Sequence, residues 1–408
     1  MRISFNDILY AFSYALDCAE QELLGVTTHH GKRVAYLCVL LGKHLQLMEN
    51  QLADLAACAI LHDNAITEYI QAEYLNGIGM ESEKSKSNKG VHCSLGEKNI
   101  KHLPLCSEAE NAILYHHERA DGSGPFGKTE GETPLFAQLI HLADNLDSNW
   151  DLGRMNQQKY QGLLQYLKEN NGSLFSETCV TAFTEAVGYS ELELLQQEDL
   201  EEILTGCLEN TQRDYSEENL LDFAKMFARI IDYKSSFTSR HSMGIAERAA
   251  QMATYYGYDR MTVAKLFFAG AVHDIGKMVI DKDVLEKPGR LSNQEYKYVK
   301  NHAYYSYKIL SRVRGLEDIT RWAALHHETL NGKGYPFGLK AEELGFNERL
   351  MACLDIYQAL TEERPYKPGF SHEKSMGILR NLVNIGNLDG TIVADLEKVY
   401  GGNPVKNS

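Results

Sequence analysis

The sequence predicts an all-α protein made of two related helical domains. Three observations favour this fold class: the 408 residues contain only eight prolines, apolar residues recur at helical spacing, and the order of the histidines repeats between the two halves. No succession of alternating apolar and polar residues indicates a parallel sheet or a β-sandwich. With 44% apolar and 24% charged residues, the composition is that of a globular chain and not of a disordered or fibrous one.

Helical periodicity begins at the start of the chain. Residues 1–21 carry Asp7, Asp17 and Glu20 inside an apolar pattern, which predicts an amphipathic helix and not a signal peptide. Residues 52–60 place apolar side chains at i, i+3, i+4 and i+7, as on one face of a helix. No apolar run reaches the roughly 18 residues needed to span a bilayer. We therefore expect a cytoplasmic protein without a membrane partner.

Two polar stretches interrupt this periodicity. Residues 81–90 predict a loop inside the first domain. Residues 168–173 lie in a region, 150–215, that has helical periodicity but no chemical motif, so we expect it to close the first domain and lead to the second. The expected division is a first domain over 1–160, a helical connector over 161–215 and a second domain over 216–408.

Charge and cysteine usage disfavour several classes of function. A formal charge of −15 at pH 7 disfavours nucleic-acid polymers as partners, because their binding depends on many Lys and Arg contacts with phosphate. A small anionic ligand is compatible with local positive charge. The eight cysteines, among them Cys18, Cys38, Cys58 and Cys353, show no CxxC pairing. They therefore predict reduced core residues and neither disulfides nor zinc ligands.

The decisive feature is a repeat of histidines and aspartates. In both halves, 32 positions separate a first histidine from a His-Asp pair, and 24 positions separate a lone histidine from a His-His pair. The two remaining intervals differ by one residue each. Core packing would not keep these histidines in register, so a duplicated domain is the simplest account. The two sets are His30, His62, Asp63, His92, His116, His117 and Asp144, and His241, His273, Asp274, His302, His326, His327 and Asp355.

Each set has the composition of a two-metal centre. Five imidazoles and two carboxylates provide enough nitrogen and oxygen ligands for two divalent transition-metal ions, and one carboxylate can bridge them. Two metals about 3.5 to 4 Å apart stabilise both the attacking and the leaving oxygen of a phosphoryl displacement. The sequence therefore predicts a phosphohydrolase with a metal centre in each half.

Three segments of the second half resemble a known family. They are HDIGK (273–277), HHETLNGKGYPFG (326–338) and DIYQALTEERPYK (355–367). In this order they resemble the signature of the HD-GYP phosphodiesterases, a branch of the HD metal-dependent phosphohydrolase superfamily. The resemblance covers about residues 220 to 405. It implies a helical domain around two or three metals, usually iron or manganese, that opens a cyclic dinucleotide by attack of water on a phosphodiester.

The resemblance also implies roles for single residues. All seven residues of the second set would be metal ligands, with Asp274 as the bridge. Asp274 and Lys277 would be the catalytic residues, Lys277 through contact with the scissile phosphate. The residues expected to bind substrate are Lys277, Tyr335, Arg364 and Lys367. Some family members hold a third metal with a glutamate four positions before the first histidine. Phe237 stands at that position here, so we expect two divalent ions per domain, iron or manganese.

The first half resembles the wider HD superfamily and lacks the HD-GYP signature. Ile66 takes the place of Lys277, the segment HHERADGSGPFG lacks the tyrosine, and no RPYK segment follows Asp144. The seven predicted ligands are nevertheless present. This combination predicts either a 5′-nucleotidase that acts on the product of the other domain or a structural or regulatory metal domain.

The expected activity is hydrolysis of c-di-GMP or 3′3′-cGAMP to a linear 5′-phosphorylated dinucleotide in the second domain. Two alternatives stay open, namely a metal-loaded cyclic-dinucleotide receptor with a regulatory role and a mononucleotide phosphohydrolase. Lys277 within an intact HDIGK segment favours the enzyme over the receptor. Assembly as a homodimer is also left open.

Overall fold

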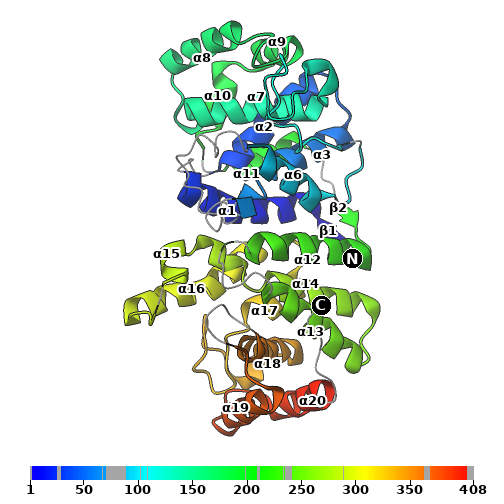
Figure 1. Cartoon of the computed structure of the whole chain (residues 1–408), viewed down its shortest axis with the longest axis vertical. Coiled ribbons are helices and arrows are strands. Elements are labelled where there is room, and N and C mark those ends of the chain that lie inside the picture. The colour runs from blue at the N-terminus through cyan, green and yellow to red at the C-terminus, as the bar shows by residue number, and fades with distance from the viewer. Residues whose placement is uncertain are drawn as a thin grey trace. The chain divides into compact units, whose positions relative to one another are not determined.

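Helices dominate the structure (Figure 1), and the predicted all-α class is confirmed. The computed structural model describes residues 2–24, 29–66, 68–69, 89–101, 103–107, 109–197, 199–208, 212–232, 234, 241–287, 289–362 and 368–401. Two three-residue strands, β1 (Arg2–Ser4) and β2 (Gln212–Asp214), pair with each other. The chain divides into an N-terminal unit, Ser4–Arg213, and a C-terminal unit, Asp214–Ser408 together with Met1–Ile3.

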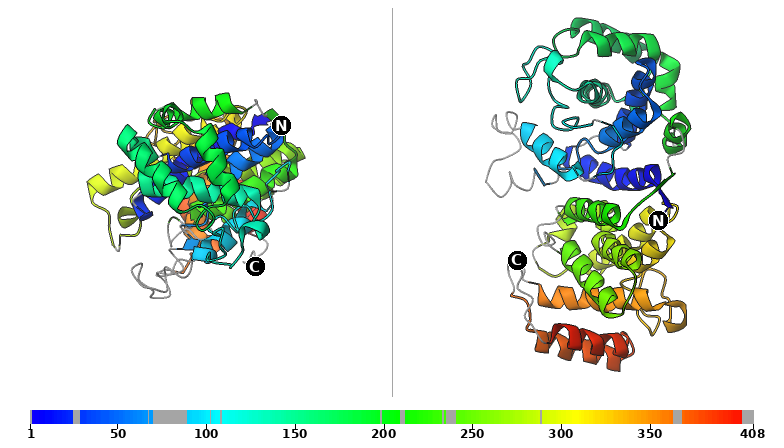
Figure 2. Two further views of the ribbon diagram at one scale, coloured as in Figure 1. Left: turned by 90° about the horizontal axis from the view of Figure 1, so that it is seen from above. Right: turned by 90° about the vertical axis from the view of Figure 1, so that its right-hand side faces the viewer.

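The N-terminal unit is built around helix α2 (His30–His44), most of whose apolar side chains are buried. Burial of a Leu or Val side chain stabilises the fold by about 1.5 to 3 kcal/mol, so the buried Val34, Leu37, Val39 and Leu41 favour a central position for this helix. The helices packed against α2 are α1 (Phe5–Leu24), α3 (Glu49–Ile60), α7 (Leu135–Trp150), α9 (Glu177–Ala186) and α11 (Leu200–Cys207). Figure 2 (right) shows α7 end-on in the interior of this unit.

Shorter elements complete the N-terminal unit. They are α6 (Lys89–Ile100), α8 (Gln157–Glu169), α10 (Tyr189–Leu194) and the 3-10 turns η1 (Glu130–Glu132) and η2 (Leu152–Arg154). Helix α1 confirms the helix expected at the start of the chain. The loop expected at 81–90 lies outside the described residues up to residue 88, and residues 89 and 90 begin α6. Of the connector expected at 161–215, the part up to residue 213 is counted with this compact unit.

The C-terminal unit is a second helical assembly. Its elements are α12 (Glu217–Asp232), α13 (His241–Tyr255), α14 (Arg260–Val272), η3 (Ile275–Val279), α15 (Lys282–Leu285), α16 (Asn293–Leu310), α17 (Glu317–Ala324), η4 (Ala341–Glu343), α18 (Phe346–Thr361), α19 (His372–Asn384) and α20 (Gly390–Tyr400). Helix α18 packs against α13 and α17 and also against α19 and α20 (Figure 2, right). Fully buried Ile245, Met351 and Leu354 from these helices and Leu266 from α14 form part of one core.

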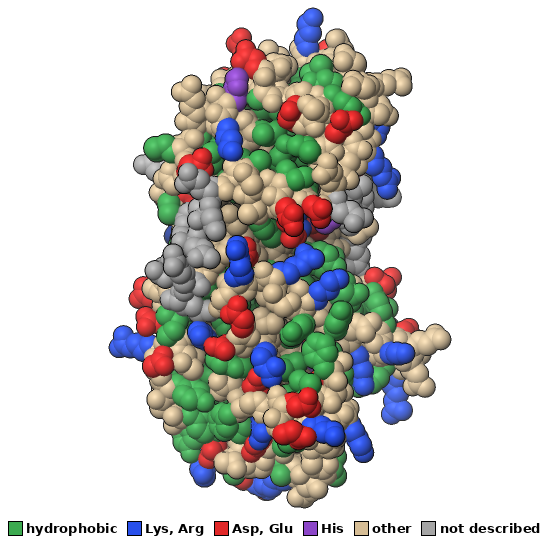
Figure 3. Space-filling view, turned by 180° about the vertical axis from the view of Figure 1, so that it is seen from behind, with side chains coloured by type: hydrophobic (Ala, Val, Ile, Leu, Met, Phe, Trp, Pro, Cys, Tyr) green, Lys and Arg blue, Asp and Glu red, His purple; other side chains and the backbone are tan. Residues whose placement is uncertain are grey.

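The described surface is mixed in charge. On the face drawn in Figure 3, Lys and Arg side chains are interspersed with Asp and Glu. None of the described helices is long and apolar enough to cross a membrane.

Candidate metal centres

The structure brings all seven predicted ligands of the second half together. Each comes from the end or the buried face of a helix in the C-terminal unit. They are His241 at the start of α13, His273 and Asp274 between α14 and η3, His302 in α16, His326 and His327 after α17, and Asp355 in α18. All except His327 are at least nine-tenths buried.

Asp274 lies at the centre of this C-terminal cluster. Its Oδ2 atom is 3.1 Å from Nε2 of His273. Its Oδ1 atom is 3.3 Å from Nε2 of His302 and 3.9 Å from Nε2 of His326. A carboxylate whose two oxygens face different histidines is placed as a bridging ligand would be.

Asp355 faces the two remaining histidines. Its Oδ1 atom is 3.4 Å from Nε2 of His241, and its Oδ2 atom is 3.6 Å from Nδ1 of His327. The other ring nitrogen of His241 donates a hydrogen bond to Oε2 of Glu362 at 2.9 Å. Glu362 was not expected from the sequence. The signal that would have found it is its spacing of seven residues from Asp355, about two helical turns.

Three histidines present Nε2 to the centre because their Nδ1 atoms are engaged elsewhere. Nδ1 of His273, His302 and His326 donates to the backbone carbonyl three residues earlier, at 2.8, 2.7 and 2.6 Å. Such a bond fixes the tautomer and the ring orientation of a metal ligand. The three Nε2 atoms and Oδ1 of Asp274 are buried without a hydrogen-bond partner among the described residues. Buried polar atoms without partners are costly, so the cluster fits bound metal ions.

The surroundings of His302 and Asp274 favour the metal-binding form of both groups. Burial lowers the pKa of His302 to about 3. His327 and Lys277 lower this pKa further, whereas Asp274 raises it. Burial alone would raise the pKa of Asp274, but His273 and Lys277 hold it well below its usual range. Neutral imidazole and ionised carboxylate are the forms that bind metals.

Two of the predicted substrate residues border the cluster. Nζ of Lys277 contacts Oδ2 of Asp274. The ring of Tyr335 lies 4.6 Å from that of His327, and Nζ of Lys300 lies 4.7 Å from the centre of the Tyr335 ring. Lys300 was not singled out from the sequence. The predicted positions outside the described residues are Arg364, Lys367 and Phe237.

A buried glutamate shapes the loop that carries Tyr335. Glu328, which is 2% exposed, accepts hydrogen bonds from the backbone N–H of Phe337 at 2.7 Å and of Leu339 at 3.0 Å. A Cβ atom at Gly334 would lie 2.5 Å from Cα of Glu328, so only glycine allows this close return of the chain. Glu328 was missed in the sequence, although it follows the His-His pair directly.

The first-half set forms a matching cluster in the N-terminal unit. Oδ1 of Asp63 is 3.4 Å from Nε2 of His92 and 3.7 Å from Nε2 of His116. Oδ1 of Asp144 is 3.3 Å from Nε2 of His30. The same atoms of the paired aspartate and the distal aspartate therefore face the same histidines in both units. The remaining members of the set are His62 after α3 and His117 after His116.

The histidines of this N-terminal cluster are oriented in the same way. Nδ1 of His62 and His116 bonds the carbonyl oxygen three residues earlier, at 2.8 and 2.6 Å. Their Nε2 atoms, and Oδ1 of Asp63, have no hydrogen-bond partner in the part of the chain that the structure describes. Burial, with His92 and His62, lowers the pKa of His116 to about 3. By the same reasoning this cluster also fits metal ions.

His30 is held by a buried ion pair. Its Nδ1 atom donates to Oδ2 of Asp147 at 2.6 Å, and Arg33 binds both oxygens of Asp147 through Nε and Nη2 at 2.7 and 2.9 Å. In the C-terminal unit Glu362 holds the corresponding histidine. Asp147 and Arg33 were not expected from the sequence. Each lies three residues after a predicted ligand, on the same helix face, and this spacing is the signal that would have found them.

The two units differ where the substrate residues lie. Ile66, 7% exposed, is buried together with Tyr69 at the position that corresponds to Lys277. The loop after His117 lacks a tyrosine but keeps its anchor, since Glu118 accepts a hydrogen bond from the N–H of Phe126 at 2.6 Å. The two units therefore share the set of predicted metal ligands, whereas the N-terminal unit has no counterpart of Lys277.

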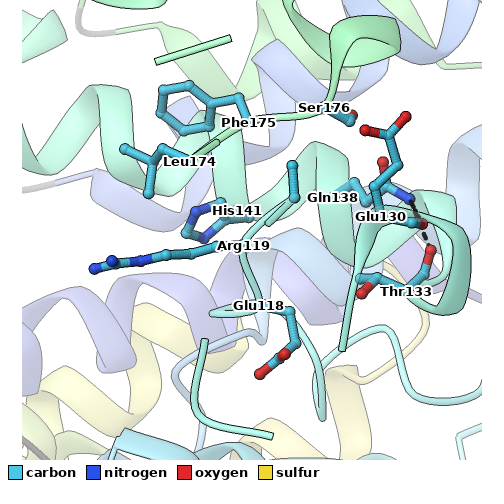
Figure 4. Close-up of a pocket in the computed structure, with 10 residues that line it drawn as sticks. Glu118, Arg119, Glu130, Thr133, Gln138, His141, Leu174, Phe175 and Ser176 are labelled. Atoms are coloured by element: carbon cyan, nitrogen blue, oxygen red, sulfur yellow. Dashed lines mark hydrogen bonds between the residues drawn. The ribbon is translucent and has the colours of Figure 1, made fainter. Parts of the chain in front are cut away.

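A small pocket lies beside the N-terminal cluster (Figure 4). His141 in this pocket bonds the carbonyl of His116 through Nδ1 at 3.0 Å. The side-chain amide of Gln138 donates to the carbonyls of Thr133 and Glu130 at 2.7 and 3.0 Å, which closes one wall. The pocket has room for about one water molecule, so it is not a nucleotide site.

Helical units with a His-Asp pair among further histidines and a distal aspartate define an HD domain. A model described as HD domain matches residues 27–149, and another with the same description matches residues 225–392. The chain belongs to the HD-domain family and carries two such domains.

Similar proteins are phosphodiesterases. The chain is 28% identical over 373 residues to 3′3′-cGAMP-specific phosphodiesterase 1 of Vibrio cholerae, an alignment that covers 89% of this chain and 85% of the relative. It is 32% identical over 170 residues to a cyclic di-GMP phosphodiesterase of Pseudomonas aeruginosa, 41% of each chain. The crystal structure of a cyclic GMP-AMP specific phosphodiesterase of V. cholerae (V-cGAP3) matches over the whole of both chains with a TM-score of 0.68 at 22% identity, which confirms the fold. The expectation of an HD-domain phosphodiesterase is confirmed by these relatives.

Proposed function

We propose that the C-terminal unit is a metal-dependent phosphodiesterase that linearises a cyclic dinucleotide. The observation that carries this proposal is the position of Lys277 beside Asp274, at the edge of a cluster whose buried ligand atoms have no other partner in the described residues. A fixed cation at this place offsets the charge that develops on a phosphate oxygen. In the N-terminal unit Ile66 stands at this position, so the same step is not proposed there.

Two ions of iron or manganese are proposed for each unit. Nitrogen and oxygen donors at these separations suit either metal. In the C-terminal unit one ion would be held by His241, His273 and Asp355 and the other by His302, His326 and His327, with Asp274 between them. When bound, the ions would supply activation of water and neutralisation of charge at phosphorus.

Hydrolysis adds one water across one phosphodiester. Attack on phosphorus breaks the P–O3′ bond, which leaves a phosphate on a 5′-oxygen and a hydroxyl on the 3′-carbon. Lys277 would bind the attacked phosphate. Tyr335, with Lys300 over its ring, would offer a face on which a base stacks. Arg364 and Lys367 are kept as proposed substrate contacts of the same unit.

We propose 3′3′-cGAMP as the preferred substrate and c-di-GMP as the competing one. The relative named for 3′3′-cGAMP aligns with 89% of the chain, and the relative named for cyclic di-GMP aligns with 41%. The two ligands differ in one base, so the preference depends on the contacts made to that base and not on the metals.

The test is a product time course on the full chain, prepared anaerobically and loaded with iron or manganese. 3′3′-cGAMP, c-di-GMP and a nucleoside monophosphate are offered separately, and the products are separated by chromatography. We expect conversion of 3′3′-cGAMP to a linear dinucleotide and a loss of about a thousandfold or more in Asp274→Ala, which lacks the central carboxylate. Ring opening retained by metal-saturated Asp274→Ala would refute the role of this residue.

The same assay separates the alternatives. Tight binding of a cyclic dinucleotide without turnover would identify a receptor. Turnover of the monophosphate alone would identify a mononucleotide phosphohydrolase. Faster cleavage of c-di-GMP than of 3′3′-cGAMP would reverse the proposed preference but leave the reaction type intact.

For the N-terminal unit we propose a 5′-nucleotidase that removes the terminal phosphate of the linear product. The observation that favours it is a cluster with buried, unpartnered ligand atoms on His62, His116 and Asp63 within the described residues, next to Ile66 instead of a lysine. The predicted metal ligands are retained, but Ile66 replaces the lysine beside them. This combination supports a different phosphate ester as substrate. A regulatory metal domain is the alternative.

A further inference from the structure

We propose that Cys93 is a thiolate ligand of the N-terminal metal centre, together with His92, His116 and His117. The inference rests on the proposal that this cluster holds metal ions. The donor atoms of the four residues all lie within 4.8 Å of one another. Cys93 and His116 are fully buried and His92 is 4% exposed, so the group is enclosed by protein.

The spacing of the sulfur suits a shared ion. Sγ of Cys93 lies 3.6 Å from Nε2 of His92. Two ligands of one tetrahedral ion, with a metal–sulfur bond of about 2.3 Å and a metal–nitrogen bond of about 2.1 Å, are also about 3.6 Å apart. An S–H···N hydrogen bond has a similar length, so a second observation is needed to choose between them.

The second observation is the set of buried atoms that face the same place. Nε2 of His116 is 3.7 Å from Oδ1 of Asp63, and neither atom has a hydrogen-bond partner among the residues that the structure describes. Both residues already lie within the cluster that contains His92. A metal ion would satisfy these atoms together with the thiolate, whereas a hydrogen bond from Cys93 to His92 would leave them unsatisfied.

The C-terminal unit shows what the centre looks like without sulfur. Ala303 follows His302 as Cys93 follows His92, and it is likewise fully buried. The ring centres of His302 and His327 are 5.1 Å apart, and those of His92 and His117 are 5.0 Å apart. The histidine arrangement therefore matches, and the sulfur is an addition to it.

A sulfur ligand would change the chemistry of this centre. Thiolate is a soft donor that favours zinc, cobalt and iron(II) over manganese. The thiol proton passes to solvent as the sulfur–metal bond forms. We therefore expect the N-terminal centre to bind a softer metal, and to bind it more tightly, than the C-terminal centre.

This proposal departs from the expectation that every cysteine is a core residue. The absence of a CxxC pair led to that expectation. Two of the proposed co-ligands of Cys93, His116 and His117, are more than 20 positions away in the sequence. Only the fold brings them beside the sulfur.

The test uses the full chain, reduced, freed of metal and titrated anaerobically with cobalt(II). Bound cobalt is counted by elemental analysis, and absorption is recorded in the near ultraviolet, where sulfur-to-cobalt charge transfer marks a thiolate ligand. Asp274→Ala serves as the background, because a weakened C-terminal centre leaves cobalt to report on the N-terminal one. We expect the band in this chain, its loss in Cys93→Ala and Cys93→Ser, and zinc affinity lowered at least about tenfold in both.

Three results would overturn the proposal. The first is cobalt bound in the N-terminal centre without the band, and the second is an undiminished band in Cys93→Ala. The third is loss of the band in Cys179→Ala, which changes a buried cysteine outside the described donor groups. Cys93→Ser keeps the size of the side chain, so it decides the matter if Cys93→Ala folds poorly. A chain that binds no cobalt there would refute the metal proposal for this unit, while phosphodiesterase activity of the C-terminal unit is assayed separately.

Discussion

Lys277 and Ile66 are the residues at which the two otherwise matching clusters differ most. Lys277 lies three positions after Asp274, one turn of η3, and its ammonium group contacts the Asp274 carboxylate. Ile66 occupies the same position after Asp63 and is buried with Tyr69. A cation at this place can offset the charge of a phosphate, whereas an apolar side chain cannot.

Replacement of Lys277 by Ala is predicted to lower kcat for ring opening by about a hundredfold, because a cation is removed from the developing charge of the phosphate. The seven predicted metal ligands of the C-terminal unit are unchanged in this variant, so its metal content should stay at the parent value. Steady-state kinetics and elemental analysis on the same preparation check both statements.

The matched control for Lys277→Ala is Lys398→Ala, an exposed lysine of α20 that pairs with Asp395. Its kcat should equal that of the parent chain. Equal activity of Lys277→Ala and Lys398→Ala would show that Lys277 has no part in the reaction.

At the scale of elements, the crossing of η3 and α16 positions Asp274 opposite His302. Ser306 of α16 accepts a hydrogen bond from the N–H of Gly276 at 3.0 Å and donates one to the carbonyl of His273 at 2.7 Å. A Cβ atom at Gly276 would lie 2.0 Å from the carbonyl oxygen of His302 and 2.6 Å from the nitrogen of Ser306. The two elements therefore meet at backbone distance, which only glycine allows.

Gly276→Ala is predicted to destabilise the C-terminal unit by about 3 kcal/mol, because the backbone of α16 must move to admit the methyl group. Urea unfolding of the metal-free chain measures the change. The same shift should weaken metal binding by moving His302 away from Asp274.

Gly377→Ala in α19 provides the comparison, since nothing lies within 4 Å of a Cβ atom at this position. It should leave stability unchanged or raise it by up to about 1 kcal/mol, as expected for Ala in place of Gly within a helix. If the Gly276→Ala chain is as stable as the parent, the close contact between η3 and α16 does not require glycine at this position.

At the scale of the whole molecule, the chain carries two HD domains with one candidate centre in each. The proposed sequence of steps uses both, with ring opening in the C-terminal unit followed by removal of the terminal phosphate in the N-terminal unit. Each centre has a counterpart aspartate, Asp274 or Asp63, whose removal should disable one step and spare the other.

Asp63→Ala is predicted to open the cyclic substrate at nearly the parent rate and to accumulate the 5′-phosphorylated linear dinucleotide. Asp274→Ala should leave the cyclic substrate intact but still dephosphorylate added linear dinucleotide. The reason is that each carboxylate is central to its own cluster. Product time courses for the two variants and the parent measure both steps.

The parent chain itself decides between the two roles of the N-terminal unit. If it stops at the phosphorylated linear product, the nucleotidase proposal fails and a regulatory role is favoured. Thermal unfolding of both variants serves as the control that each unit is still folded.

The sequence by itself determined the all-α class, the duplication and the membership of both clusters. Metal-ligating chemistry is restricted to a few residue types, and a repeat of their intervals survives even where the surrounding residues differ. The structure brings both sets of seven together. Their metal binding stays a prediction until the ions are measured.

Only the tertiary structure decided which atoms face the centres and what holds them. Nδ1 of five ligands is engaged by a backbone carbonyl, and Asp147 and Glu362 hold the first histidine of each set. Glu328 anchors the loop of Tyr335, and Cys93 lies beside His92. These partners are ordinary residue types whose spacing from a ligand is noticed only once the cluster is known, and a side chain acquires such a role only when the fold removes it from water and leaves one specific neighbour within reach.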